Sequence, residues 1–483
     1  MAMILPKINL RDLESSASAP LLEEVANVVK FQSSQGVEVR ATVLKLTPQS
    51  VFFELCTPDS VLRLSEVLDQ FEIFADDRLI YSGKATVSSM VNAGELTVGE
   101  ATLEEASLRM DLLQIFKPNV LPSAFQSFLH RWQAFYKVLP EYKLVVADIQ
   151  SFLHLLRLWL DQLELRIDGP PEERARIGRA ILQELPINPI LGALFERFET
   201  VAASIPQELV AAHRAFGQRQ LHSLLLGAPF LYRTYAKPLG YAGDYEMMNM
   251  IVRNGLEGKS LYAKVINSYL LSQVAPEAVR NRVGFLQGKI VDETSRVAKG
   301  GGTASIYCIA CGPAWEVQNF VRESPLADRA RFRLLDFNEE TLEHTARRME
   351  EASRTNHRKA SVEMVKNSVQ SLLKNRRKSA RTEDGYDLIY CSGLYDYLND
   401  RVVKALNAYL YDQLRPGGLL VVGNFAAGTP VRNFMEHFAE WFLIYRNGQQ
   451  LSALAPEQAP PENCHVVSEF SGANIFLEVR KPT

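Results

Sequence analysis

Several features that would place this chain in a simple class are missing from its 483 residues. It has no uncharged apolar run of about 18 residues, which argues against a membrane-spanning helix. Its net charge of −3 gives no electrostatic reason to expect nucleic-acid binding. Its five cysteines are scattered and odd in number, which favours a reducing compartment over a disulfide scaffold. We therefore expect a cytoplasmic protein.

A secretory signal and a metal site are also missing. Residues 1–16 contain no extended apolar segment and soon become charged, unlike a signal peptide. The eight histidines show no metal-ligand spacing. Cys308 and Cys311 have no second cysteine pair to complete four ligands, so we predict no metal. What is present is ordinary globular composition, 47% hydrophobic, in a chain long enough for two or three domains.

The first expected domain, residues 1–116, is a small β-barrel. Residues 1–30 are interpreted as a flexible arm with a short helix, whereas 37–103 contain short β-rich segments separated by turns. The strand pattern resembles a PilZ barrel. However, Arg40 stands alone where cyclic-dinucleotide binding needs an arginine-rich motif, and the turn 46–50 lacks the acid and glycine of the second motif. We therefore expect a degenerate barrel that serves in docking or dimerisation.

The second expected domain, residues 117–298, is helical. It follows a linker at 117–122, has apolar spacing typical of a helical bundle, and contains a break at 168–173. A short glycine-rich segment at 299–303 then introduces a different pattern.

The third expected domain, residues 299–483, alternates strands and helices. This alternation, closed by two strands joined by only a few residues, predicts a doubly wound α/β sheet with an antiparallel C-terminal hairpin. A basic run at 374–381 is interpreted as a solvated helix or loop. The expected strands are 305–310, 332–337, 361–366, 386–392, 418–425, 465–470 and 474–480.

The first of these strands carries the most informative motif. It ends in a turn of small residues, Ala310, Gly312 and Ala314, and passes into a helical pattern. Small residues allow the backbone of such a turn to approach a ligand closely. Asp336 ends the second strand 24 residues after Gly312, where an acid can bind ribose hydroxyls. The pattern predicts a nucleotide-type cofactor at the carboxyl ends of the strands.

These motifs, with the turn into the fifth strand at 414–425, resemble class I S-adenosylmethionine (SAM) methyltransferases. The resemblance implies a Rossmann-like sheet that binds SAM, with its methionine part on the small-residue turn and its adenine near the end of the third strand. Cys308 stands where the family often has an acid, and Glu316 is expected to substitute in part. The implied cofactor residues are Ala310, Gly312, Ala314, Glu316, Asp336, Asn338, Asn367, Ser368 and Ser392.

Segments 232–251, 391–398 and 423–447 resemble a narrower bacterial family, the 3-hydroxypalmitic acid methyl ester biosynthesis proteins. This resemblance covers about residues 200–483 and implies methylation of the carboxylate of a small or fatty acid. A carboxylate is ionised at neutral pH and needs no general base, so alignment and water exclusion become the main tasks. The two glycines of 240–245 suit a lid over the site.

Tyrosines in these segments are expected to face the sulfonium, because aromatic faces stabilise cations. An arginine is expected to hold the acid's carboxylate, and Glu436 and Trp441 to lie on one helical stretch beside an acyl pocket. The expected catalytic residues are Tyr241, Tyr245, Tyr395 and Tyr397. The expected substrate-binding residues are Arg233, Tyr235, Asn424, Arg432, Glu436, Trp441 and Arg446.

Two other functions remain open from the sequence. Cys308 in place of the acid favours attack at the aminocarboxypropyl carbon of SAM, with release of methylthioadenosine. A non-catalytic scaffold that only senses SAM is the other alternative. A homodimer through the barrel or the bundle also remains open.

Overall fold

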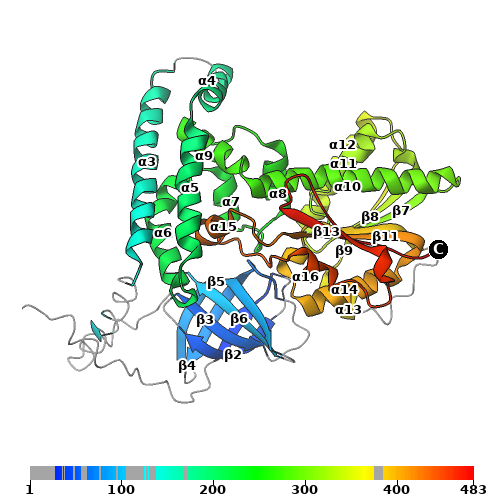
Figure 1. The fold of residues 1–483 in the computed structure, drawn as a ribbon, viewed down its shortest axis with the longest axis horizontal. Helices are drawn as coiled ribbons and strands as arrows, with labels where there is room; N and C mark the ends of the chain where they lie inside the picture. Colours follow the sequence, from blue (N-terminus) through cyan, green and yellow to red (C-terminus); the bar gives the residue numbers. More distant parts are fainter. Residues whose placement is uncertain are drawn as a thin grey trace, which may run out of the picture.

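The computed structural model contains a β-barrel, a bundle of helices and a sheet flanked by helices (Figure 1). The expected arm over residues 1–27, the linker 117–122 and the basic run from residue 375 onward lie outside the described residues. The described residues are 28–34, 36, 38–46, 49–55, 62–75, 78–93, 96–104, 125–126, 129, 137–167, 171–374 and 385–483.

Six antiparallel strands close the barrel in the order β1-β2-β3-β6-β5-β4. Alternate side chains enter its core, as in β2, where Val39 and Ala41 are buried and Arg40 is exposed. β1 corrects the expectation of an arm up to residue 30, because Val29 and Phe31 alternate into the barrel core. The strands are β1 (Val28–Gln32), β2 (Glu38–Leu46), β3 (Ser50–Leu55), β4 (Val67–Ala75), β5 (Arg78–Ala93) and β6 (Leu96–Leu103).

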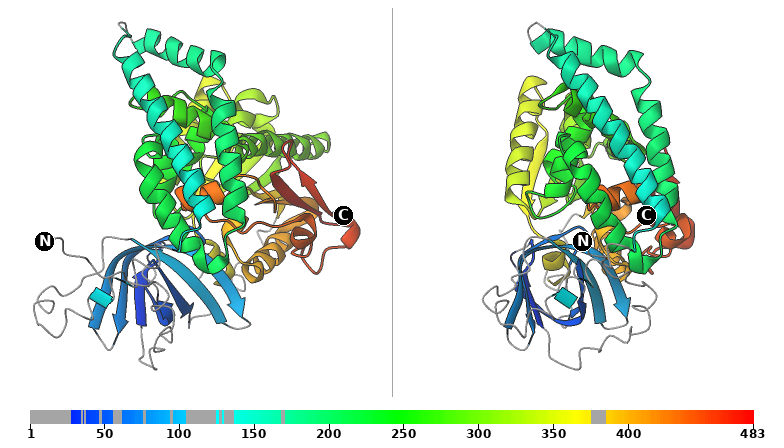
Figure 2. Two further views of the ribbon diagram at one scale, coloured as in Figure 1. Left: turned by 60° about the vertical axis from the view of Figure 1, so that its left-hand side comes forward. Right: turned by 90° about the vertical axis from the view of Figure 1, so that its left-hand side faces the viewer.

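The helical bundle stands beside the sheet and above the barrel (Figures 1 and 2). The helix α3 buries Tyr142, Val145, Ile149 and Leu153 at spacings of three and four residues, so one apolar face packs on the bundle core. The helices are α3 (Pro140–Glu164), α4 (Pro171–Glu184), α5 (Ile187–Ala203), α6 (Val210–Leu225), α7 (Pro229–Ala236), α8 (Tyr245–Arg253), α9 (Leu261–Leu271) and α10 (Val274–Lys299).

The sheet has seven strands in the order β12-β13-β11-β10-β7-β8-β9. β7 to β11 run parallel, and β13 pairs antiparallel with β11, which confirms the doubly wound sheet with a C-terminal hairpin. The antiparallel strand lies one place in from the edge, and β12 forms the edge itself. The strands are β7 (Ala304–Ile309), β8 (Ala330–Asp336), β9 (Ser361–Lys366), β10 (Tyr386–Cys391), β11 (Leu414–Phe425), β12 (Cys464–Ser468) and β13 (Asn474–Arg480).

Helices cover both faces of the sheet. α10, α11 (Trp315–Glu323) and α12 (Glu339–Thr355) pack on one face, and α13 (Val369–Lys374), α14 (Asp400–Asp412) and α16 (Gly448–Ser452) on the other. α15 (Arg432–Phe438) instead leaves the sheet after β11 and buries Met435 and Phe438 in the bundle core. The chain after β11 therefore joins the sheet to the bundle.

The barrel is docked on the rest of the chain through its own core. Phe442, which follows α15, is 5% exposed and packs among the core residues of the barrel. Its backbone N–H donates to Ser65 Oγ at 2.6 Å, and the same hydroxyl donates to the Phe442 carbonyl at 3.0 Å. The Val67 N–H donates to the Gly240 carbonyl at 2.8 Å, so the barrel also contacts the expected lid.

Among the described residues, no helix combines the length and the apolar character needed to cross a bilayer.

Candidate cofactor and acceptor site

A cavity of about 1050 Å³, counted with its open mouth, lies at the carboxyl ends of β7, β8, β10 and β11. The loop before α8, the helix α10 and one segment of the barrel cover it. The position follows from the topology, because parallel strands place their carboxyl ends and following loops at one edge of the sheet. Among the expected site residues, those that line it are Tyr241, Tyr245, Ala310, Gly312, Ala314, Glu316, Asp336, Ser392, Tyr397 and Trp441.

The small-residue turn after β7 has an unusual backbone. Ala310, Gly312 and Ala314 all adopt the left-handed conformation, with φ of 52°, 52° and 49°. A Cβ on Gly312 would meet nothing within 4 Å, so no neighbouring atom excludes a side chain there. Glycine is favoured because of the left-handed backbone conformation. The two alanines are strained by roughly 1–2 kcal/mol each, which is typical of a backbone that is shaped for a ligand.

Asp336 ends β8 beside this turn and is 5% exposed. One carboxylate oxygen accepts the Gly312 N–H at 3.1 Å, and the other accepts the Asn338 N–H at 3.0 Å. Burial raises the pKa of Asp336, although these two donors oppose the rise. Each oxygen retains acceptor capacity beyond its single backbone donor, so the carboxylate can accept hydrogen bonds from a diol in the cavity.

Two buried charges of opposite sign line another part of the cavity. Glu316, in the first turn of α11, accepts a hydrogen bond from the Tyr390 hydroxyl at 2.7 Å, and burial raises its pKa. Arg282 of α10 donates to the Ser392 carbonyl at 3.0 Å and to Met248 Sδ at 3.6 Å. No ion pair joins Glu316 and Arg282 in the described part of the chain, so both can bind charged groups of a ligand.

Asp396 and Tyr397 follow β10 and face the cavity from another side. One oxygen of Asp396 accepts the Phe425 N–H at 2.6 Å and the Asn424 Nδ2–H at 3.0 Å. Burial raises the pKa of Asp396 to about 7. The Tyr397 hydroxyl accepts the indole N–H of Trp441 at 2.8 Å, which leaves the hydroxyl proton available to a ligand.

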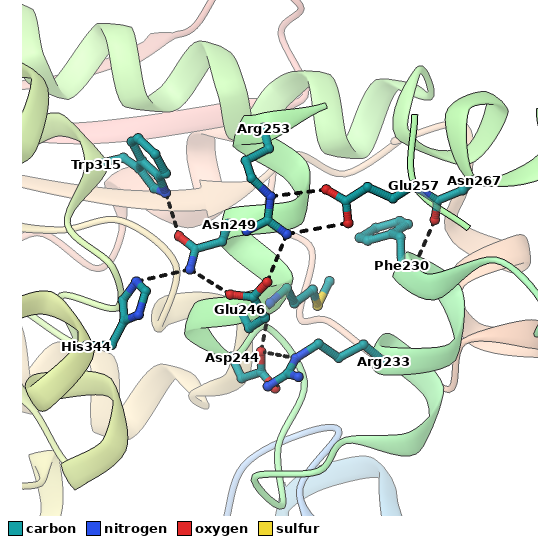
Figure 3. Close-up of polar contacts among 11 residues, drawn as sticks. Phe230, Arg233, Asp244, Glu246, Asn249, Arg253, Glu257, Asn267, Trp315 and His344 are labelled. Atoms are coloured by element: carbon teal, nitrogen blue, oxygen red, sulfur yellow. Dashed lines mark hydrogen bonds and ion pairs between the residues drawn. The ribbon is translucent and has the colours of Figure 1, made fainter. Parts of the chain in front are cut away.

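The expected lid is tied to the sheet side of the molecule through α8 (Figure 3). Asp244 caps α8 and accepts a hydrogen bond from Arg233 Nε at 2.8 Å. The side chain of Asn249 accepts the Trp315 indole N–H at 2.8 Å and contacts His344 at 3.2 Å. These contacts connect α8 with α11 and α12, so they hold the lid residues Tyr241 and Tyr245 over the cavity.

The three arginines expected to hold a substrate carboxylate do not line the cavity, which corrects that expectation. Arg233 is paired with Asp244, and Arg432 pairs with Glu436 at 2.7 Å near the surface. Arg446 is 2% exposed and donates to Asp400 at 2.7 Å. Each is already neutralised by a nearby acid. The arginines that line the cavity are Arg63 and Arg282, which we had not identified from the sequence.

Other expected residues also lie outside the cavity lining. Tyr395 donates to Asn407 of α14, on the side of β10 that faces away from the cavity. Tyr235 packs edge-on against His222. Asn424 is fully buried and positions Asp396. These three side chains therefore contact other parts of the protein and do not line the cavity, and their expected roles stay predictions.

Three residues near the second and third strands hold backbone structure instead. Asn338 caps α12 by accepting the Thr341 N–H at 2.9 Å. Asn367 and Ser368 follow β9, where their side chains accept N–H groups of the next turn. None of the three lines the cavity. Trp441 does, but it lies beyond the end of α15 and not on one helix with Glu436, which corrects the expected helical stretch.

Comparisons with known proteins give only structural likeness. No protein-family model matches the chain, and no curated protein matches it. One similar solved structure is described as a possible exported protein from Bordetella parapertussis, at 15% identity, covering 66% of this chain and 100% of that one, with a TM-score of 0.40. The SAM-dependent methyltransferase SibL is similar at 14% identity over 70% of this chain and 96% of that one, with a TM-score of 0.35.

The N-methyltransferase NodS from Bradyrhizobium japonicum, in complex with S-adenosylhomocysteine, is similar at 13% identity over 50% of this chain and 98% of that one, with a TM-score of 0.30. Scores this low do not decide the fold. The strand order and the terminal hairpin do, and they are those of a class I methyltransferase sheet.

Proposed function

We propose that this chain is a SAM-dependent methyltransferase that methylates the carboxylate of a fatty or other small carboxylic acid. The observation that carries the cofactor assignment is the set of buried acids around a single cavity together with the buried Arg282. Glu316 and Arg282 both line the cavity and form no ion pair with each other. The carboxylate of Glu316 therefore complements the ammonium of an amino acid, and the guanidinium of Arg282 complements its carboxylate. Asp336 complements a ribose diol, so the cavity matches both halves of SAM.

The position of Glu316 supports the expectation that this residue replaces the acid that is missing at Cys308. The Cys308 thiol and the Glu316 carboxylate both lie beside the Tyr390 hydroxyl, so the helix supplies a carboxylate next to the strand position that lacks one. With Glu316 binding the cofactor's ammonium, the absence of an acid at Cys308 no longer favours attack at the aminocarboxypropyl carbon.

When bound, SAM supplies an electrophilic methyl group on a sulfonium. A carboxylate oxygen forms the new O–CH3 bond as the S–CH3 bond breaks, and the bonding pair stays on sulfur, so an anion and a cation become a neutral ester and a neutral thioether. No proton has to leave the acid. The chain's own task is to align the acid and exclude water, which the lid residues Tyr241 and Tyr245 and the barrel segment support by covering the cavity.

A second cavity supports an acid with an apolar tail. It measures about 1280 Å³ with its open mouth and lies within the bundle, lined largely by apolar side chains of α5, α7, α9 and α15. Trp441 lines both this cavity and the cofactor cavity, so its indole forms part of the wall between them. An acyl chain in the bundle cavity would place its carboxylate near Trp441 and Tyr397.

The test is mass spectrometry of the full-length protein with SAM, with and without 3-hydroxypalmitate. We expect S-adenosylhomocysteine and the methyl ester only when the acid is present. Glu316→Gln should weaken SAM binding strongly, whereas Glu323→Gln, at the exposed far end of the same helix, should not.

Two outcomes would reject the proposal in favour of the alternatives. Methylthioadenosine formed without any acid would show attack at the aminocarboxypropyl carbon. Tight SAM binding without turnover, over acids of several chain lengths, would favour a scaffold that senses SAM.

A further inference from the structure

The barrel contributes a charged side chain to the cofactor cavity. Arg63 lies in the segment 62–66 that leads into β4, is 6% exposed, and lines the cavity together with Leu64. Its guanidinium stacks over the ring of Phe337, 4.5 Å from the ring centre. Phe337 directly follows Asp336 in the chain. A residue from the first hundred therefore reaches the loops of a sheet that begins two hundred residues later.

Arg63 is not in an ion pair among the described residues, although its charge opposes the burial-driven rise in the pKa of the nearby Asp336. The Nε of Arg63 is buried without a hydrogen-bond partner among those residues. The nearest acid in the sequence, Glu66, is fully buried and engaged elsewhere. Glu66 accepts hydrogen bonds from Ser34 at 2.7 and 2.8 Å and from the backbone N–H of Arg63 at 2.9 Å. A buried cation in this state is complementary to an anionic ligand.

The segment that carries Arg63 is held firmly against the acceptor side of the site. Ser65, with φ of 58°, bonds both backbone groups of Phe442, and Val67 bonds Gly240 of the lid. Trp441 lines the bundle cavity and the next residue, Phe442, packs in the barrel core, so these two residues join the wall of the bundle cavity to the barrel. Arg63 needs no rearrangement of its backbone to meet a ligand.

The surroundings of Arg63 differ from those of Arg282. Arg282 faces Glu316 and the Ser392 carbonyl, the groups that complement the amino-acid part of the cofactor. The charge of Arg63 opposes the burial-driven rise in the pKa of Tyr241, Asp336 and Tyr397. Tyr397 lies within electrostatic reach of both arginines, whereas Tyr241 and Asp336 lie within reach of Arg63. The two guanidiniums therefore occupy different parts of the cavity wall, Arg63 over Phe337 and Arg282 at the Ser392 carbonyl.

We propose that Arg63 binds the carboxylate of the acid acceptor, which makes the barrel part of the active site. This inference rests on the proposed methylation of an acid. A guanidinium can hold a carboxylate through two parallel hydrogen bonds, which orients one oxygen toward the methyl group while the other stays bound. The barrel then acts as a specificity element of the same chain, in addition to any docking or dimerisation role.

The test measures binding of 3-hydroxypalmitate, below its micellar concentration, to full-length protein saturated with S-adenosylhomocysteine, by calorimetry. Arg63→Met should raise the Kd for the acid roughly 10- to 100-fold, the range expected for a lost hydrogen-bonded charge. The Kd for S-adenosylhomocysteine should change less than about twofold. Arg40→Met, at an exposed position of the same barrel, is the matched control and should change neither constant.

Two further variants separate a binding role from a structural one. Guanidinium ion at millimolar concentration should restore part of the acid binding of Arg63→Ala. If Arg63 only supported the structure, added guanidinium would not restore acid binding. If Arg63→Met fails to fold, Arg63→Lys carries the test, since its ammonium keeps the charge but not the paired geometry and should weaken the acid several-fold.

The proposal is overturned if Arg63→Met or Arg63→Lys binds the acid as the wild type does. It is also overturned if these variants keep binding the acid but no longer bind S-adenosylhomocysteine. Absence of acid binding to the wild type would overturn it together with the proposed function. Acid binding that depends on Arg63, without any methyl ester in the turnover assay, would retain this inference and reject the methylation.

Discussion

The two ends of the cavity are built from different kinds of sequence. The cofactor end is formed by Gly312, Glu316 and Asp336, which lie within one β-α-β unit, together with Arg282 from the helix just before it. The acceptor end takes Arg63 from the barrel, with residues from the lid, from the loop after β10 and from the chain after α15. The first is a local product of one supersecondary unit, whereas the second exists only when the three parts of the molecule are packed together.

The difference predicts that the two ends can be damaged separately. Substitutions at the cofactor end should weaken binding of SAM and leave the barrel in place. Substitutions at the acceptor end should leave SAM binding intact and change which acids are bound.

The largest effect is expected at the cofactor end. Asp336→Ala removes the proposed ribose acceptor and the partner of the Gly312 and Asn338 N–H groups. We expect the Kd for SAM to rise roughly 100- to 1000-fold by calorimetry, since hydrogen bonds to a charged group are lost. Asp336→Asn, which keeps one acceptor oxygen, should lose less. Wild-type affinity in Asp336→Ala would show that SAM does not bind at this end.

The next effect concerns the junction of the barrel with the bundle. Phe442→Ala removes a buried ring from the barrel core and should lower the free energy of unfolding by about 3 kcal/mol, as measured in urea. We expect acid binding to weaken with it while SAM binding persists. Phe470→Ala is the matched control, because Phe470 is 96% exposed. Equal stability of the two variants would contradict the docking of the barrel through Phe442.

The pH dependence of kcat/KM tests which kind of acceptor the site takes. Burial raises the pKa of Asp396 to about 7, so it is neutral below that pH and negatively charged above it. A carboxylate acceptor is repelled by the charged form. For an acid that is already ionised, kcat/KM should therefore be level between about pH 6 and pH 7 and fall up to tenfold per pH unit above it. The sulfonium charge of bound SAM should move the midpoint lower without changing the sign.

Asp396→Asn is the control for this profile, because its oxygen can keep the hydrogen bonds from Phe425 and Asn424. The variant should abolish the decline at high pH. A rate that instead rises with pH and disappears in Asp396→Asn would identify Asp396 as a general base, and the acceptor would then be a hydroxyl or an amine.

The smallest effect is expected at the wall between the two cavities. Trp441→Phe shortens the wall and removes the hydrogen bond to Tyr397. We expect a several-fold change in kcat/KM and a shift in preference among 3-hydroxy acids of different chain length, with Phe434→Leu, which lines only the bundle cavity, as a comparison. An unchanged chain-length preference in both variants would place the acyl chain elsewhere.

The same contrast explains what the sequence could reveal. Asp336 and the small-residue turn were accessible because their spacing along the chain reflects the β-α-β unit itself. Arg282 was harder to identify from the sequence. It lies on the apolar face of α10 with Val279 and Leu286, and a charged residue on an apolar face indicates a functional position. The role of Arg282 was nevertheless missed.

Arg63 left no such signal. It is one arginine in a turn of the barrel, and only the packing of the barrel against Phe442 and Gly240 brings it to the cavity. The errors for Arg233, Arg432 and Arg446 have the same origin, because a sequence does not show that each arginine already has an acid beside it. Pairing of charges is decided by tertiary contacts, whereas strand order is largely decided by local patterns.

The insertion of Phe442 into the barrel has a consequence for the order of folding during synthesis. The barrel strands are synthesised before the bundle and the sheet, yet one residue of their core is supplied only after the bundle and most of the sheet have been made. Domains generally fold in the order of synthesis, but here the barrel, which is made before the bundle and the sheet, completes its core after most of them. Until Phe442 has been made, the barrel core lacks this ring and Arg63 has no sheet cavity to line.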